Sequence, residues 1–177
     1  RATEDGPVRR IVIVRHAKSD WSDESLADHE RPLAPRGIDA LARMRDHLGA
    51  GRPPDLVLCS SARRTVDTLD EIREAFPGDI EVLVDDALYG ASSSMLVDRL
   101  RSLDDDVRGV LLVGHNPGVH DLALALAGSG DAETRTRMAA KFPTGAIATL
   151  SFESEWSDLA PGAASLDGYF TPRGGTL

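Results

Sequence analysis

The chain has 177 residues, of which 41% are hydrophobic and 28% charged, as is typical of one soluble globular domain with a sizeable core. The formal net charge of −9 disfavours a broad nucleic-acid or anionic-membrane surface, and no apolar run is long enough to span a bilayer. Cys59 is the one cysteine, which excludes an internal disulfide and favours a reducing cytoplasm. We expect it to be a core residue rather than a nucleophile.

Runs of β-branched residues alternate with stretches of helical periodicity along most of the chain. The runs are typical of buried strands, and the periodic stretches of helices with one apolar face. In chain order we expect a frayed terminus (1–8), a strand (9–14), a long polar loop (17–34), a helix from Pro35 to about 49, a strand (55–59), a helix (62–75), a strand (80–84), a helix (92–103), a strand (108–113), a helix from Pro117, a short helix (131–140), a last strand (147–152) and a mostly irregular tail.

Strands that alternate with helices predict an α/β fold, here a three-layer α/β/α sandwich around a mostly parallel sheet. We expect a single domain over residues 1–177, with a core at about 9–152 and an irregular C-terminal tail. In the first helix, Ile38, Leu41, Ala42 and Leu48 are expected to face the core. Asn116 is expected to cap the helix that begins with Pro117, because both residues are favoured at those positions.

Cationic and imidazole side chains follow three of the predicted strands, at the points where the strands end. Arg15 and His16 follow the first strand, Arg64 lies at the start of the helix after the second, and His115 follows the strand at 108–113. Ligands of open α/β sheets bind beyond the carboxyl ends of strands, so we expect these side chains to converge in one crevice. Each alone is explained as an ion-pair partner, a structural histidine or part of a helix cap; the four at matching positions favour a site.

These residue types together predict phosphate chemistry. Two arginines offer forked donors that match phosphate oxygens, and the helix N-termini after Ser61 and Asn116 add backbone N–H donors. A neutral histidine attacks phosphorus, and a second, protonated histidine stabilises the charge of the transferring group. The residues alone leave open which of His16 and His115 plays which role. Because fixed cations supply the charge, we expect no metal or other cofactor.

The chain resembles the histidine phosphatase superfamily, which also contains the cofactor-dependent phosphoglycerate mutases. Arg15-His16-Ala17 is similar to the superfamily's Arg-His-Gly motif, and Ala17-Lys18 resembles the small bacterial branch known for SixA, the phosphohistidine phosphatase. The resemblance covers residues 9 to about 152. The other matching residues are Ser60, Arg64 and Thr68 of the second motif, Gly114 to Gly118 of the Gly-His-Asn-Pro-Gly motif, and Arg31-Pro32-Leu33, Arg36-Gly37, Leu88-Tyr89 and Pro143-Thr144-Gly145.

The resemblance implies a phosphoglycerate mutase-like fold and a role for each matching residue. By this resemblance, His16 is the nucleophile that becomes phosphohistidine. Arg15 and Arg64 would hold the phosphoryl oxygens, and His115 would form a hydrogen bond with the phosphoryl group. It identifies no general acid, and the SixA-like branch often lacks an obvious one, which suits a phosphoramidate better than an alkyl phosphate ester. The carboxylates considered for this role are Asp20, Asp23, Asp28, Asp85 and Asp86.

We therefore expect a metal-independent phosphatase that acts on protein phosphohistidine in the cytoplasm, with no nucleic-acid or membrane partner. The alternatives are a small-molecule phosphomonoesterase and a phosphate-binding adaptor without turnover. A mutase needs further basic residues to hold a bisphosphate, and no such cluster stands out in the sequence. Lys18 is expected to extend the cationic rim, Trp21 to anchor the loop, and His29 to lack matching partners.

Overall fold

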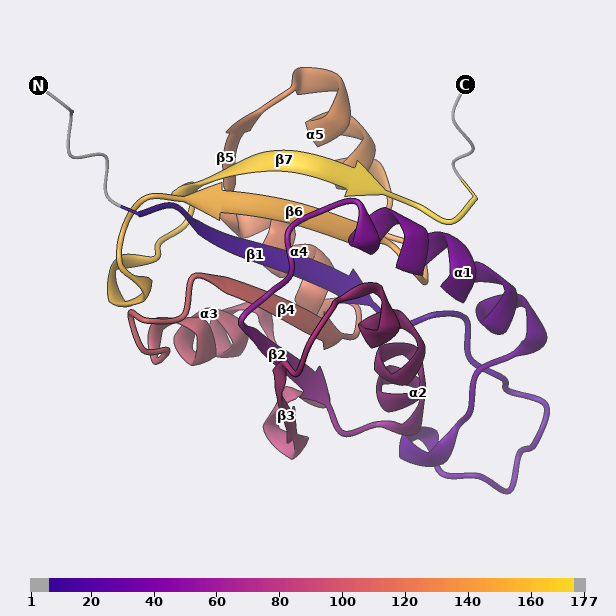
Figure 1. The fold of residues 1–177 in the computed structure, drawn as a ribbon. Helices are drawn as coiled ribbons and strands as arrows, with labels where there is room; N and C mark the ends of the chain where they lie inside the picture. Colours follow the sequence, from indigo (N-terminus) through magenta and orange to yellow (C-terminus); the bar gives the residue numbers. More distant parts are fainter. Residues whose placement is uncertain (1–6, 174–177) are drawn as a thin grey trace, which may run out of the picture.

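One sheet of seven strands lies at the centre of the part that the computed structural model describes, residues 7–173 (Figure 1). The strand order is β3-β2-β4-β1-β6-β7-β5. The strands are β1 (Arg9–Arg15), β2 (Leu56–Ser60), β3 (Glu81–Asp85), β4 (Gly109–Gly114), β5 (Ala127–Gly130), β6 (Ile147–Phe152) and β7 (Ala164–Phe170).

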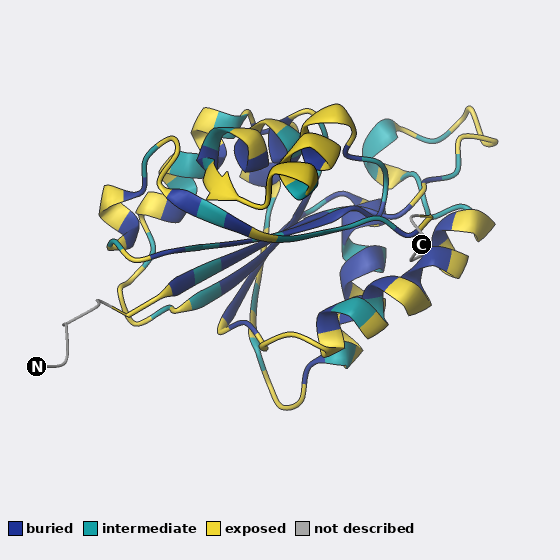
Figure 2. Ribbon diagram, turned by 90° about the horizontal axis from the view of Figure 1, so that it is seen from above, coloured by how far each residue is buried: buried dark blue, intermediate teal, exposed yellow. Residues whose placement is uncertain are grey.

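Helices cover both faces of this sheet (Figure 2). Successive side chains of a strand point to opposite faces, so Val12 and Val14 pack with the helices on one side while Ile11 and Ile13 pack with those on the other. The first side carries α1 (Pro35–Gly49) and α2 (Arg63–Ile72), and the second carries α3 (Ser93–Arg101), α4 (Gly118–Leu126) and α5 (Ala132–Ala140). Single 3₁₀ turns lie at Asp28–Glu30, Arg73–Ala75, Asp86–Leu88 and Trp156–Asp158.

The sheet is parallel where the sequence predicted it to be, which confirms the α/β sandwich. β1 pairs in parallel with β4, β4 with β2, and β2 with β3. β1, β2 and β4 therefore end at one edge of the sheet, at the right in Figure 1. β6 is antiparallel to both β1 and β7. Within the described residues, no helix is long and apolar enough to cross a membrane.

The C-terminal tail, which we expected to be mostly irregular, contains the strand β7, antiparallel to β6. The sequence of β7 includes Ser165, Asp167 and Gly168, which carry little strand propensity, and β5 is the short run Ala-Gly-Ser-Gly. Pairing with neighbouring strands, rather than local propensity, makes these two segments strands. The fraying expected at 1–8 falls mostly on residues 1–6, which lie outside the described residues, as do Gly174 and Gly175 of the tail.

Two local expectations were also wrong. Ile38 is 58% exposed and Ala42 is exposed too, because α1 turns Gly37, Ala40 and Met44 toward the core instead. Asn116 does not cap a helix: α4 begins at Gly118, and the Asn116 amide donates to the carbonyl of Phe142 (2.9 Å). The helix expected at 62–75 is α2 followed by a single 3₁₀ turn.

Candidate active site

His16 lies directly beyond β1 and is 94% buried at the edge where the parallel strands end. Its Nδ1 is 2.7 Å from the carbonyl oxygen of Ala17. A carbonyl only accepts hydrogen bonds, so Nδ1 carries the proton and the lone pair of the neutral ring is on Nε2. Burial, helped by the charges of His115, Arg64 and Arg15, lowers the pKa of His16 to about 3. His16 is therefore neutral near pH 7.

Arg15 and Arg64 bring two guanidinium groups to the same place. Arg15, the last residue of β1, donates from Nη1 to the carbonyl of Phe142 (3.0 Å), while its buried Nε has no hydrogen-bond partner among the described residues. Burial, and then the charge of Arg64, lowers the pKa of Arg15. Arg64 comes from the first turn of α2 and is 93% buried. These forked donors are suited to an oxyanion bound between them.

His115 completes the group of four residues predicted from the sequence. It follows β4, and its ring centroid lies 5.2 Å from that of His16. Its Nε2 is 2.7 Å from the hydroxyl oxygen of Ser60, and its buried Nδ1 has no partner among the described residues. Burial, followed by the charge of Arg64, lowers the pKa of His115 to about 4. These surroundings favour a neutral ring, whereas we expected the second histidine to be protonated.

Arg64 is held by Asp28, a residue of the long loop. Arg64 donates from Nη1 to the Asp28 backbone carbonyl (2.8 Å) and from Nη2 to the Asp28 carboxylate (3.1 Å). The hydroxyl of Tyr89 donates to the same carboxylate oxygen. These bonds, first that from Tyr89 and then that from Arg64, lower the pKa of Asp28. An ionised carboxylate has no proton to donate, so Asp28 is suited to position Arg64 rather than to act as a general acid.

Sequence reasoning missed the aromatic side of this site. The ring of Tyr89 lies edge-on to His115 (5.5 Å between centroids) and to His29 (5.0 Å). His29 also has its Nε2 at 2.9 Å from the hydroxyl oxygen of Ser61, so the expectation that it lacks partners was wrong. Leu88-Tyr89 matched a family pattern in the sequence, but no local signal assigned Tyr89 a role. The contact arises because β3 and the long loop meet only in the fold.

The other four candidate carboxylates lie in or next to turns, and three of them accept hydrogen bonds from the backbone of their own turn. Asp20 accepts from the backbone N–H of Ser22 (2.8 Å), and Asp23 accepts from that of Ser25 (3.0 Å). Asp85 caps the turn after β3 and lies 3.8 Å from Arg99. Asp86 has no side-chain partner within residues 7–173, and it lies in that same turn, beyond the end of β3. Of the five candidate carboxylates, Asp28 is the one in contact with Arg64.

Three further features bear on expectations from the sequence: the thiol of Cys59, the ring of Trp21 and the distribution of metal-binding side chains. Cys59 is fully buried, and burial raises its pKa to about 12, so it remains a thiol in the core as expected. Trp21 is 58% exposed; its indole donates to Ser19 and its ring lies under the guanidinium of Arg31. It therefore braces the loop from outside the core. Within residues 7–173, no group of three or more His, Cys, Asp or Glu side chains is placed to hold a metal ion.

Gly118 shows why the Gly-His-Asn-Pro-Gly segment ends in glycine. A Cβ on Gly118 would lie 2.2 Å from the carbonyl oxygen of Ala91, far inside van der Waals contact. The first turn of α4 therefore packs directly against the backbone that precedes α3. This close approach fixes the start of α4 and, with it, the position of His115 three residues earlier.

Comparison with known proteins places the chain among phosphatases. Residues 11–92 match the sequence profile of the histidine phosphatase superfamily (branch 1). An uncharacterized protein of Mycobacterium tuberculosis is 42% identical over 164 residues, which cover 90% of this chain and the whole of that protein. An uncharacterized chloroplastic protein of Arabidopsis thaliana is 30% identical, over 93% of this chain and 78% of its own length.

Two solved structures are similar over almost their whole length. A protein of Nakamurella multipartitia described as a "putative phosphohistidine phosphatase SixA" superposes with a TM-score of 0.83 at 28% identity, covering 96% of this chain and 99% of its own. The Agrobacterium tumefaciens protein of the same description superposes with a TM-score of 0.78 at 28% identity, covering 94% and 99%.

Proposed function

This chain belongs to the histidine phosphatase superfamily, in its SixA-like branch, and is a phosphatase; we propose that it acts through a covalent phosphohistidine at His16 and that its substrate is protein phosphohistidine. The observation that carries the proposal is the bond between His16 Nδ1 and the Ala17 carbonyl. It leaves the Nε2 lone pair of a neutral imidazole as the attacking group, beside two arginines and a second histidine.

The first step transfers the phosphoryl group. His16 Nε2 attacks phosphorus, the bond from phosphorus to the leaving nitrogen or oxygen breaks, and a bond from phosphorus to Nε2 forms. The ring becomes cationic while Nδ1 keeps its proton, and the Ala17 carbonyl stabilises that N–H. Arg15 and Arg64 hold the oxygens, whose charge is spread in the transition state. The anionic group raises the pKa of His115, because a nearby opposite charge favours the imidazolium.

The second step returns the enzyme to its starting state. A water oxygen attacks phosphorus, the bond to Nε2 breaks, and inorganic phosphate leaves while His16 becomes neutral again. The leaving group of the first step takes its proton from solvent, because Asp28 is ionised and none of the other four candidate carboxylates contacts the described pocket residues. A phosphoramidate nitrogen accepts that proton more readily than an ester oxygen does, which supports a phosphohistidine substrate.

The test compares three phosphate donors: a phosphohistidine protein, phosphoserine peptides and small phosphate esters. We expect turnover of the first to exceed that of the others. A ³²P-labelled donor and a rapid alkaline quench should trap an alkali-stable, acid-labile label on the wild-type chain and none on His16→Ala. His47→Gln is the matched control, because His47 stacks on Phe170 away from the site and should label normally.

Each other outcome identifies a different function. Faster turnover of the small esters would indicate the phosphomonoesterase instead. Phosphate binding without turnover of any donor would indicate the adaptor. Turnover that survives in His16→Ala would show that His16 is not the nucleophile.

A further inference from the structure

A second cavity, of about 590 Å³, adjoins the phosphoryl pocket formed by Arg15, His16, Arg64 and His115; it is lined in part by segment 141–145, which also contacts Arg15. It lies where the N-terminal half of α1, the end of α5 and the end of β7 meet; Figure 1 shows α1 and the end of β7 at the right-hand edge of the sheet. Its volume is in the range of small-molecule sites. The described lining residues are Lys18, Arg36, Ala40, Arg43, Arg137, Lys141, Pro143, Thr144, Tyr169, Thr171, Pro172 and Arg173.

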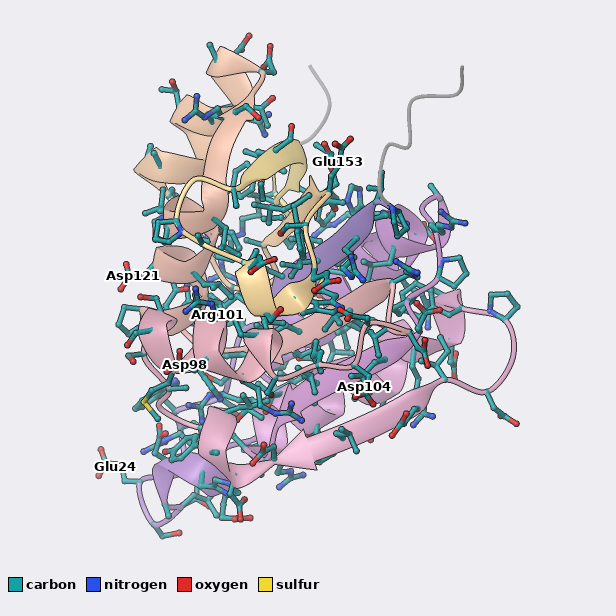
Figure 3. The ribbon with its side chains drawn as sticks, turned by 90° about the vertical axis from the view of Figure 1, so that its left-hand side faces the viewer. Glu24, Asp98, Arg101, Asp104, Asp121 and Glu153 are labelled. Carbon is teal, nitrogen blue, oxygen red and sulfur yellow. The ribbon has the colours of Figure 1, made fainter. Side chains whose placement is uncertain are left out.

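The charge of this cavity is of one sign. Six of its twelve described lining residues are lysine or arginine and none is acidic, although the whole chain carries a net charge of −9. Among residues 7–173, none of these six side chains takes part in an ion pair. Figure 3 shows the opposite edge, where β1 begins, with the acidic Asp104 and Glu153 labelled. A concave surface of one charge focuses the electrostatic field and attracts counter-ions.

The walls of the cavity are fixed by contacts within the fold. The hydroxyl of Tyr169 donates to the carbonyl of Lys141, and the guanidinium of Arg137 lies 5.5 Å from the centroid of the Tyr169 ring. Ala40 and Pro172 are buried beneath it. The backbone positions that carry the charges are therefore held before any ligand arrives, which lowers the entropic cost of binding.

The cavity adjoins the phosphoryl pocket but does not include it. Lys18 is two residues from His16, so their Cα atoms are at most about 7 Å apart. Segment 141–145 contacts both sites: Lys141, Pro143 and Thr144 line the cavity, while the carbonyl of Phe142 accepts from Arg15 and the N–H of Gly145 donates to the carbonyl of His16 (2.9 Å). Neither Arg15 nor His16 lines the cavity.

We propose that this cavity is a second anion site, which binds a small molecule that carries two or more phosphate groups. Arginine forks match phosphate oxygens, and six cations distributed around a cavity of this size are suited to several phosphates rather than to one. An acidic protein segment would require a groove that continues along the surface, whereas this cavity, which is partly open to solvent, has the volume of a small-molecule site. The site does not depend on catalysis at His16.

The test is calorimetric titration of the intact chain with inorganic tripolyphosphate, with orthovanadate present in excess to fill the phosphoryl pocket. We expect one further binding event that weakens as salt is added. The double variant Arg43→Gln/Arg137→Gln should weaken it at least tenfold while phosphatase turnover and the melting temperature stay near wild type. Arg101→Gln is the matched control, since Arg101 is an exposed arginine on α3, away from the cavity (Figure 3).

Three outcomes would overturn this assignment: no binding of tripolyphosphate in the presence of vanadate, equal binding by the double variant, and binding of poly-aspartate but not of tripolyphosphate. The two proposals fail separately. Loss of phosphatase turnover in His16→Ala leaves tripolyphosphate binding intact, and loss of tripolyphosphate binding in the double variant leaves turnover intact.

Discussion

The guanidinium of Arg64 is held at both of its terminal nitrogens by Asp28, one through the backbone carbonyl and the other through the carboxylate. This contact joins the long loop to the first turn of α2 and buries the charge of Arg64 against a partner. A buried arginine that lost this partner would leave donors unpaired, at a cost of about 1–3 kcal/mol. The loop is thus part of the phosphoryl pocket through this contact.

Substitution of Asp28 distinguishes a positioning residue from a general acid. Because Asp28 is ionised beside Arg64, we expect Asp28→Asn to keep kcat for a phosphoramidate within about tenfold and to bind vanadate more tightly, since a negative charge is removed. Urea denaturation should show the free energy of unfolding reduced by about 1–3 kcal/mol. A fall in kcat of about 10²–10⁴ would instead indicate general acid catalysis.

The protonation state of His16 can be read by nuclear magnetic resonance. Burial and neighbouring cations disfavour the imidazolium, so we expect the ring to stay neutral from pH 8 to pH 5, with the proton on Nδ1. Nitrogen-15 shifts distinguish the two tautomers directly. Titration of His16 near pH 6.5, or a proton on Nε2, would contradict this description.

The lowered pKa of His16 also makes the stability of the fold depend on pH. The pKa of His16 is about 3 in the folded chain and near 6.5 in the unfolded chain, so between these values the unfolded state binds more protons. Stability therefore falls as the pH drops below 6.5. Urea denaturation measures the free energy of unfolding at pH 7 and at pH 5. Between these pH values it should fall by about 1–2 kcal/mol less for His16→Gln than for wild type. An unchanged difference between the two pH values would show that His16 is not desolvated as described.

We expect each arginine of the phosphoryl pocket to contribute to turnover through the planar, forked donors of its guanidinium group. We expect Arg15→Lys to lower kcat/KM by about 10²–10³, because lysine keeps the charge but not the planar donors. Arg10→Lys is a matched control, since Arg10 lies on the same strand and lines a different cavity. Steady-state kinetics on one phosphoramidate measure both variants; equal rates for wild type and Arg15→Lys would rule out a role for the fork.

The close approach of Gly118 to the backbone of Ala91 should make the free energy of unfolding sensitive to substitution of this glycine. A Cβ there would collide with the Ala91 carbonyl, so Gly118→Ala should reduce the free energy of unfolding by about 1–3 kcal/mol. Gly51→Ala is the control, because its Cβ would lie no nearer than 3.5 Å to another atom, and it should change stability by less than about 1 kcal/mol. Equal denaturant midpoints for the two variants would show that α4 shifts without cost.

Much of the fold could be predicted because its signals are local. A parallel strand buried on both faces reads as a continuous apolar run, and β1, β2 and β4 were each found from such a run. β5 and β7 were missed because their residues have little strand propensity. Their strand structure depends on pairing across the sheet.

The sequence by itself determined which residues follow the ends of the parallel strands: Arg15, His16, Arg64 and His115. Strand direction alone brings them together, so their positions in the chain were enough. Only the tertiary structure decided what surrounds them, namely the contacts of Asp28 and Tyr89 and the tautomer of His16. Likewise, the six cations of the second cavity are spread from Lys18 to Arg173. Charges so far apart in the chain form a cluster only when folding places α1, α5 and β7 side by side.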